Sequence, residues 1–446
     1  MKKEWLLLLI SVAATVIVAL GLIRWLAPDL LGAPTDLQLV QLDEKVPAFY
    51  KGVFREEHFN YADLQLKDPL TRVRNHPLYP RVAVTGPHDI LGFRNMAVPV
   101  AADVIAIGDS VTYGNNAIME QNWPGYLQTA INRDDVNVYN MSTGGWAAVQ
   151  YLDMFSNATL FEPRVMIVTF YTGNDSLESF MMVYGNEHWN WLMPDAGLSV
   201  ADAPSVAFPA PETERWPVAF QDGVSTVFTP TLRLASNQDS QAVKAGYDIM
   251  AAVAGHISGL AEKAAVNVVF TIVPTKELVF AEKVKREGIT VPQDYELLVQ
   301  HESENIDDLA EAITALPNAV YIDLLTPLQN SALAAENLYT ASMDGHPAAA
   351  GYRLIGETIA QQISQFIPQR VCGLYALQNG DSYQMLMVNK EGVWNFTSED
   401  SIEKNGWSPG TVRSIKLRDI INLPHHGVIA TVDKVRFGPA FCESAK

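Results

Sequence analysis

The sequence predicts an α/β protein built on a parallel β-sheet. Between residue 101 and about residue 368, short apolar runs alternate with longer amphipathic segments. This alternation is typical of parallel strands that are joined by helical crossovers and covered by helices on both faces. Hydrophobic residues make up 48% of the 446-residue chain, which is enough for a sizeable core.

The individual elements follow from the positions of these runs. The predicted strands are 103–107, 137–140, 165–170, 266–272 and 319–322. The predicted helices are 123–132, 147–155, 241–264, 295–315 and 348–367. Together they define a predicted domain at residues 101–370.

Three other regions flank or interrupt this domain. Residues 29–100 show few periodic signals and are predicted to be a lead-in segment that packs onto it. Residues 187–230 contain six prolines and three tryptophans, so they cannot form a helix or a central strand. We interpret them as an insertion, with a lid as one role; its tryptophans either bind ligand or anchor it to the core. Residues 371–446 have short strand-like runs between turns, which predicts a small β-rich module.

The net charge of −19 limits the partners. The chain has 31 Lys and Arg against 50 Asp and Glu, which argues against nucleic-acid binding. Residues 371–446 hold eight acidic and eight basic residues, so the whole excess lies in residues 1–370. An acidic region repels anionic polymers and lipid headgroups at low salt, and we therefore expect a substrate that is neutral or locally uncharged.

An apolar segment at residues 5–26 predicts a membrane anchor, which we assign to residues 1–28. It has no charge before Arg24, and nineteen helical residues at 1.5 Å each nearly span a hydrocarbon layer of about 30 Å. Lys2 and Lys3 precede it, so we expect a cytoplasmic N-terminus, with the rest of the chain exported to the periplasmic or extracellular side. A cleaved signal peptide is the alternative, although the run is longer than usual and no clear Ala-x-Ala site follows.

The chain has two cysteines, Cys372 and Cys442, and both lie in the terminal module. An exported compartment permits oxidation, so we expect a disulfide; two buried free thiols are the alternative. Two cysteines exclude a zinc-finger framework, and the His425-His426 pair lacks further ligands at metal spacing. We expect neither a metal nor a cofactor.

The strongest chemical signal is VIAIGDSVTYG at residues 104–114. An apolar strand runs directly into Gly108-Asp109-Ser110, which places the serine at the carboxyl edge of a parallel sheet, where open α/β folds have their sites. The segment has neither the Gly-Lys-Ser/Thr of a phosphate loop nor the second glycine of a Gly-x-Ser-x-Gly elbow. By itself, such a serine could equally be a helix N-cap.

A second motif, Asp344-Gly345-His346-Pro347, precedes a predicted helix. A serine becomes a good nucleophile when an imidazole takes its proton, and the imidazole needs a carboxylate to hold its tautomer. Ser110, His346 and Asp344 supply these three types of group. Capping and turn roles for Asp344 and His346 are the alternative.

Two more turns follow predicted strands and offer hydrogen-bond donors. Gly145 lies in NMSTGGW after the second strand, and Asn174 lies in TGND after the third. With the N–H of Ser110, the N–H of Gly145 and the amide of Asn174 could hold an oxyanion. The alternative is that both are ordinary turns that use Gly and Asn for their backbone conformation.

These four motifs, in this order, resemble the SGNH, or GDSL, hydrolases over roughly residues 90–368. The resemblance implies a flavodoxin-like three-layer fold, no metal, and ester chemistry by a Ser–His–Asp triad. Ser110 would be the nucleophile, His346 the general base and Asp344 its partner; Ser110, Gly145 and Asn174 would form the oxyanion hole.

One feature departs from the commoner family pattern. Asp344 stands two residues before His346 rather than three, and Met343 occupies the usual position. This spacing resembles SGNH proteins that transfer O-acetyl groups to exported polysaccharides, including the alginate-type acetyltransferases.

We therefore expect a membrane-anchored, extracytoplasmic serine esterase that hydrolyses O-acetyl or short acyl esters. Acylated carbohydrates are among the expected substrates. An O-acyltransferase acting on an exported polysaccharide is the first alternative. The second is a non-catalytic protein that binds a glycan or a partner protein through residues 371–446.

Overall fold

The computed structural model describes residues 64–133, 135–205, 207–367, 372–379, 382–389, 392–408, 412–420, 423, 425–429 and 442. No helix within these ranges is both long and apolar enough to cross a membrane. The predicted anchor at residues 5–26 lies outside them, so it stays a prediction.

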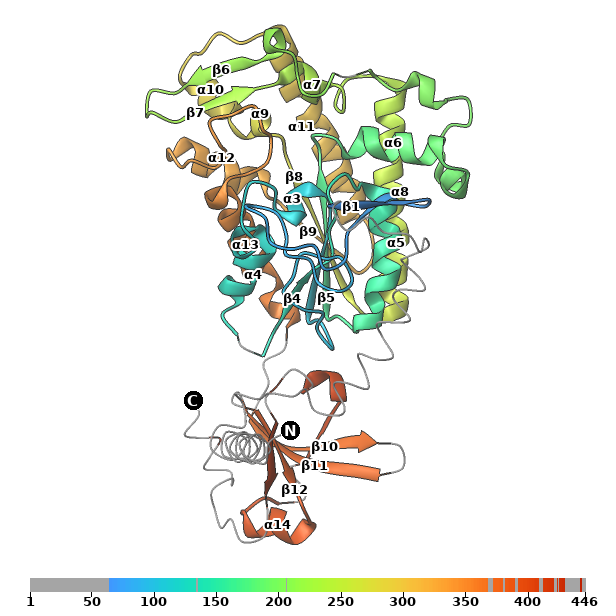
Figure 1. Ribbon diagram of the computed structural model, residues 1–446, viewed down its shortest axis with the longest axis vertical. Helices are drawn as coiled ribbons and strands as arrows, with labels where there is room; N and C mark the ends of the chain where they lie inside the picture. The colour runs from blue at the N-terminus through green and yellow to red at the C-terminus, as the bar shows by residue number, and fades with distance from the viewer. Residues whose placement is uncertain are drawn as a thin grey trace, which may run out of the picture. The chain divides into compact units, whose positions relative to one another are not determined.

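A five-stranded, all-parallel sheet forms the centre of the larger part of the chain (Figure 1). Its strands, in spatial order, are β4 (Val138–Asn140), β3 (Val104–Ile107), β5 (Val165–Tyr171), β8 (Asn267–Val273) and β9 (Ala319–Ile322). Numbered along the chain, the order is 2-1-3-4-5, which is the flavodoxin-like arrangement. The structure confirms the predicted α/β class and parallel sheet, and each predicted strand agrees to within one residue at either end.

Helices cover both faces of this sheet. Figure 1 shows α5 (Ala148–Ala158) and α8 (Gln241–Ala264) on one side, and α4 (Trp123–Ile131) and α13 (Ala349–Ile363) on the other. Side chains of β3 alternate between two separate cores: Ile105 and Ile107 join the first, whereas Val104 and Ala106 join the second. A strand that buries both faces explains why the sequence shows continuous apolar runs here.

Several other helices complete this part of the chain. The long helix α11 (Gln293–Thr314) agrees with the prediction at 295–315. The helices that the sequence analysis did not predict are α3 (Ser110–Tyr113), α6 (Asp175–Gly185), α7 (Pro230–Leu234), α9 (Lys276–Val279), α10 (Ala281–Arg286) and α12 (Leu325–Leu333). Most of them are short, and a helix of one or two turns offers little periodicity to detect.

The described part of the lead-in segment, residues 64–100, contains a small hairpin of β1 (Gln65–Asp68) and β2 (Arg72–Asn75). It contacts the domain through hydrogen bonds: the indole of Trp146 donates to the carbonyl of Val73 at 2.7 Å. Further along, the buried guanidinium of Arg94 donates to five backbone carbonyls of residues 84–117. Residues 64–100 therefore pack onto the domain, and residues 29–63 of the predicted lead-in segment lie outside the described residues.

Over its described residues, the proline-rich insertion consists of 3₁₀ segments and one hairpin, and it ends where α7 begins at Pro230. It comprises η4 (Glu187–Leu192), η5 (Val200–Asp202), η6 (Glu212–Glu214) and an antiparallel hairpin of β6 (Trp216–Ala219) and β7 (Ser225–Phe228). Trp189 is buried and donates to the carbonyl of Leu70 at 2.8 Å. The ring of Trp216 packs against Tyr295 of α11, with centroids 4.9 Å apart. These contacts favour the anchoring interpretation for both tryptophans; a lid role stays a hypothesis.

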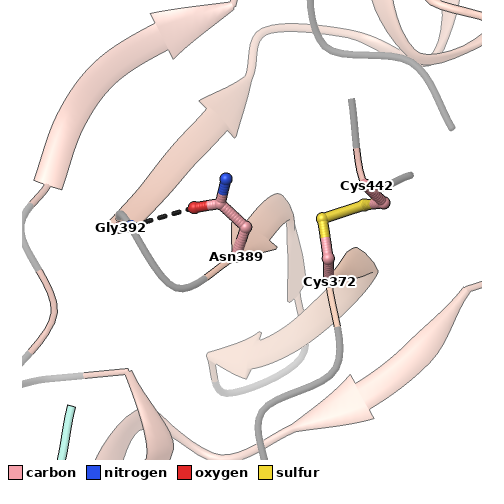
Figure 2. Close-up of a disulfide and its surroundings, with 4 residues drawn as sticks. All are labelled: Cys372, Asn389, Gly392 and Cys442. Carbon is pink, nitrogen blue, oxygen red and sulfur yellow. Dashed lines mark hydrogen bonds between the residues drawn. A yellow bond between two sulfur atoms is a disulfide. The ribbon is translucent and has the colours of Figure 1, made fainter. Parts of the chain in front are cut away.

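The C-terminal residues form a second five-stranded sheet with its own hydrophobic clusters. Its strands, in spatial order, are β13 (Arg413–Ile415), β10 (Gly373–Asn379), β11 (Ser382–Asn389), β12 (Gly392–Phe396) and β14 (His425–Ile429), and one helix, α14 (Glu399–Lys404), accompanies them. Strands β10, β11 and β12 pair antiparallel, and the outer two pair parallel to their neighbours. The Gly392 N–H at the start of β12 donates to Asn389 Oδ1 at the end of β11, at 3.1 Å (Figure 2).

A disulfide joins Cys372 and Cys442 (Figure 2), which confirms the expected pairing. The two Cα atoms are 5.3 Å apart, and the bond links residues 70 positions apart in the sequence. In the chain-entropy account, a cross-link of this span restricts the unfolded chain and stabilises the folded module by about 4 kcal/mol.

Removing this disulfide should destabilise the C-terminal sheet selectively. In a Cys372→Ser, Cys442→Ser double variant, we expect the module's free energy of unfolding to fall by about 4 kcal/mol. Urea titration followed by amide hydrogen exchange of residues 373–396 measures this change, with exchange of the buried strand β5 as the internal control. Equal protection of the module in the variant and the parent would contradict the prediction.

Candidate active site

Ser110 lies at the carboxyl edge of the central sheet, three residues after the end of β3 and at the start of α3. Asp109 caps that helix: its carboxylate accepts the N–H of Val111 at 2.8 Å. Gly108 makes the turn possible, because a Cβ there would lie 2.1 Å from Thr112 Oγ1. The Gly-Asp-Ser sequence therefore fixes the serine at the end of a buried strand.

His346 and Asp344 reach Ser110 from the turn before α13. His346 Nε2 lies 2.8 Å from Ser110 Oγ, and His346 Nδ1 lies 2.6 Å from Asp344 Oδ1. The same Asp344 oxygen accepts the backbone N–H of His346 at 2.9 Å, so the two-residue spacing forms a closed turn around the imidazole. The structure brings the three predicted residues into one hydrogen-bonded chain.

The electrostatic surroundings of Asp344 within the Ser110–His346–Asp344 hydrogen-bonded chain favour its ionised form. Burial opposes its ionisation, but the hydrogen bond and the charge of His346 outweigh burial and hold the pKa of Asp344 well below its usual value. A carboxylate that stays ionised can hold the Nδ1–H tautomer of His346 and leave Nε2 free to accept the Ser110 proton.

A second carboxyl group, Asp109, lies 3.2 Å from Ser110 Oγ. Asp109 is fully buried, and this burial raises its pKa above the usual value. The group is therefore harder to ionise than Asp344, and it already accepts the N–H of Val111. We therefore interpret Asp109 mainly as the cap of α3 and expect it to be a weaker proton acceptor than Asp344.

Gly145 and Asn174 line the same cleft as Ser110 and His346. Gly145 has a φ of +81°, and its carbonyl accepts Arg72 Nη2 at 2.9 Å. Asn174 directly precedes α6, and its Oδ1 is buried without a partner among the described residues. The cleft has a volume of about 730 Å³, which is within the range of small-molecule sites.

Lys276 is a residue that sequence reasoning missed. It opens α9 and is fully buried, and its ammonium donates to the carbonyls of Ser342 at 2.7 Å and Asp344 at 2.9 Å. One lysine thus fixes the backbone of the turn that carries Asp344 and His346. In the sequence it belongs to an unremarkable Thr-Lys-Glu-Leu helix start, and only the fold shows its contacts.

Replacing Lys276 with Met should slow any reaction that depends on the Ser110–His346 pair, without abolishing substrate binding. We expect kcat to fall by about tenfold to a hundredfold, because small displacements of catalytic groups have effects of this size. Steady-state kinetics that give kcat and KM separately test this, with a urea titration to establish that the variant is folded. A folded variant with unchanged kcat would show that the tether does not matter.

Glu302 of α11 connects two turns at the carboxyl edge of the sheet. It accepts hydrogen bonds from the hydroxyl of Thr172 after β5 and from the N–H of Thr275 after β8, the latter at 2.7 Å. Burial raises the pKa of Glu302 from 4.5 to about 7, despite these hydrogen bonds. The folded state therefore holds its proton at a pH where the unfolded chain has released it.

This shift predicts a stability that depends on pH. As pH rises from about 4.5 to about 7, the unfolded chain binds fewer protons at this site than the folded chain, so the free energy of unfolding should fall. Glu302→Gln removes the titration, and we expect it to flatten that dependence. Urea unfolding midpoints of the parent and the variant, each measured at about pH 5 and about pH 8, give the change in stability between the two pH values. The same change in both proteins would contradict the assignment to Glu302.

Solved structures provide the comparison with known proteins, because no family model and no curated protein matches the chain. A lipolytic protein of the G-D-S-L family from Desulfitobacterium hafniense is 16% identical with a TM-score of 0.31, over 58% of this chain and 97% of that chain. The esterase EstA from Pseudoalteromonas is 12% identical with a TM-score of 0.29, over 59% and 98%. Axe2, an acetylxylan esterase from Geobacillus stearothermophilus, is 10% identical with a TM-score of 0.33, over 60% and 99%.

Proposed function

We propose that this protein is a serine esterase that cleaves carboxylic esters through an acyl-enzyme. The observation that carries the proposal is the hydrogen-bonded chain from Ser110 Oγ to His346 Nε2, and from His346 Nδ1 to Asp344 Oδ1, with distances of 2.8 and 2.6 Å. Each distance is within the range for proton transfer between a nucleophile, a general base and the base's partner.

In the first half of the reaction, Ser110 Oγ forms a bond to the acyl carbon while its proton passes to His346 Nε2. The tetrahedral oxyanion is stabilised by the backbone N–H groups of Ser110 and Gly145 and by the Asn174 amide, with the backbone donors in fixed positions. The imidazolium, stabilised by Asp344, then gives the proton to the leaving alcohol oxygen as the C–O bond breaks. The products are a free alcohol and an ester on Ser110.

In the second half, water attacks the Ser110 ester. His346 takes a proton from the water, the acyl carbon becomes tetrahedral again, and the proton returns to Ser110 as the carboxylic acid leaves. An alcohol in place of water in this step would make the protein an O-acyltransferase. The two-residue spacing from Asp344 to His346 resembles the spacing in polysaccharide acetyltransferases. For this reason the acyltransferase is the alternative to be tested.

We also propose that residues 5–26 anchor the chain in a membrane and that the catalytic domain lies on the extracytoplasmic side. The Cys372–Cys442 disulfide supports this proposal, because structural disulfides persist in oxidising compartments. Lys2 and Lys3 before the apolar segment support the orientation.

Acetate release with and without an oligosaccharide acceptor tests the proposed reaction. With p-nitrophenyl acetate as donor, we expect nitrophenol and free acetate in equal amounts, and an acceptor-independent rate. Transfer of the acetyl group to the oligosaccharide in place of free acetate would favour the acyltransferase. Ser110→Ala serves as the background in both cases, and a rate no higher than that of Ser110→Ala would exclude both enzymes.

A further inference from the structure

The cleft that contains Ser110 and His346 does not share the acidic excess of the whole protein. Its charged or titratable lining residues are Glu178, Arg233, Asp344 and His346, besides tyrosines. Glu178 pairs with Arg72 at 2.6 Å, and Asp344 pairs with His346. Among the described residues, Arg233 has no carboxylate within 4.0 Å. Arg233 is therefore the charged lining residue of this cleft that has no ion pair within the described part of the chain.

Arg233 lies beside the proposed general base. It extends from α7, and its guanidinium carbon is 5.9 Å from the centre of the Tyr171 ring. A Cβ on Gly345, the residue between Asp344 and His346, would be 2.4 Å from Arg233 Nη2. Gly345 thus leaves room for the guanidinium next to the turn that carries His346.

Two polar groups at this place lack protein partners within the described chain. Arg233 Nε is shielded from solvent without an acceptor, and the hydroxyl of Tyr171, a residue only 3% exposed, makes no hydrogen bond. The two groups are neighbours, because a Cβ on Gly345 would also lie 2.9 Å from the Tyr171 hydroxyl. Buried polar groups are nearly always paired, so an unpaired donor and hydroxyl side by side in a cleft wall indicate a ligand.

Arg233 keeps its charge in this environment. Burial disfavours the cation, but the electrostatic effects of Tyr171, Glu277 and Asp344 outweigh burial and raise the pKa of Arg233. Glu277 is no direct partner: its Oε1 accepts the N–H of Thr229 at 2.8 Å. A desolvated cation without a bonded anion is costly, and a guanidinium matches the two oxygens of a carboxylate.

We propose that Arg233 and the Tyr171 hydroxyl form a carboxylate-binding subsite. This inference rests on the proposed esterase function and specifies its substrate: an acyl ester of an alcohol that itself carries a carboxylate. The carboxylate belongs to the alcohol part because Arg233 contacts Gly345, next to the imidazole that protonates the leaving alcohol. The subsite revises our expectation of a neutral or locally uncharged substrate. That expectation rested on the net charge of residues 1–370, whereas the subsite follows from the charges that line the cleft.

A matched pair of esters tests the subsite. para-Acetoxybenzoate and para-acetoxybenzamide differ by one charge at the far end of the alcohol, and the ratio of their kcat/KM values measures the preference for a carboxylate. We expect Arg233→Gln to lower this ratio by about tenfold or more, since hydrogen bonds to charged groups have effects of this size. Arg233→Lys and Tyr171→Phe should lower it less. Arg81→Gln, which removes a surface cation paired with Glu120, should leave it unchanged.

An unchanged ratio in Arg233→Gln, with ester hydrolysis intact, would overturn the subsite and leave the esterase standing. Binding gives a readout that needs no turnover: in the Ser110→Ala protein, calorimetry should show para-hydroxybenzoate binding more tightly than para-hydroxybenzamide, and Arg233→Gln should remove the difference. Equal binding of the two would also overturn the subsite. Failure of the esterase itself appears separately, as hydrolysis of both esters at the Ser110→Ala rate.

Discussion

Replacing Ser110 with Ala is expected to lower kcat/KM for p-nitrophenyl acetate by about 10³-fold or more. The hydroxyl that His346 Nε2 contacts at 2.8 Å is the group that forms the bond to the acyl carbon in the proposed reaction. Losses of this size are typical when a nucleophile of such a chain is removed, and the residual rate comes from binding and the oxyanion donors. Initial rates at several substrate concentrations measure the effect.

The matched control for this variant is Ser156→Ala. Ser156 lies on α5, and its hydroxyl donates to the carbonyl of Leu152 in the same helix. Its removal should change kcat/KM by less than about twofold, because that hydroxyl makes only a local helix contact. A Ser110→Ala protein that is folded and still hydrolyses the ester at the parent rate would show that the reaction takes place elsewhere.

Replacing Asp344 with Asn should lower kcat by about 10³-fold or more while the fold remains intact. An amide cannot hold His346 in the tautomer with hydrogen on Nδ1, nor stabilise the imidazolium, although it can occupy the same space. The expected kinetic signature is a large fall in kcat with a small change in KM, because Asp344 acts on the imidazole rather than on the bound ester.

The control for Asp344 is the other carboxyl near Ser110. Asp109→Asn keeps the helix cap, since Asn and Asp cap about equally well, and we expect kcat to fall by less than about tenfold. The two variants measured together decide which carboxylate serves the histidine. A larger loss in Asp109→Asn than in Asp344→Asn would assign the role to Asp109, the residue beside the serine.

The sequence predicted the parts of this protein that depend on local patterns. The buried strands β3, β5 and β8 are continuous apolar runs, and a strand that is buried on both faces produces that pattern directly. Ser110 could be proposed because it directly follows such a strand, and Asp344 and His346 because they lie in a short turn before a predicted helix. Their residue types suggested the chemistry, and the parallel topology placed the turns at one edge.

Residues whose role depends on the tertiary structure were missed. Lys276 and Arg233 are far in sequence from the Asp344–His346 turn, and nothing in their own segments distinguishes them from a helix-start lysine and a surface arginine. Strands β1 and β2 were missed because QLKD and RVRN are short and polar. The membrane anchor and the domain boundaries stay predictions.

The most direct test of the account is to locate the acyl group on the enzyme. The protein is mixed with p-nitrophenyl acetate, quenched with acid during turnover, digested and analysed by mass spectrometry. In the parent protein, we predict one acetyl group on the peptide that contains Ser110. A larger acetylated fraction is expected in Asp344→Asn where deacylation slows more than acylation. No acetylation of this peptide is expected in Ser110→Ala. Acetylation of another residue that accounts for turnover, or full turnover without any acetyl-enzyme in rapidly quenched samples, would contradict Ser110 as the nucleophile.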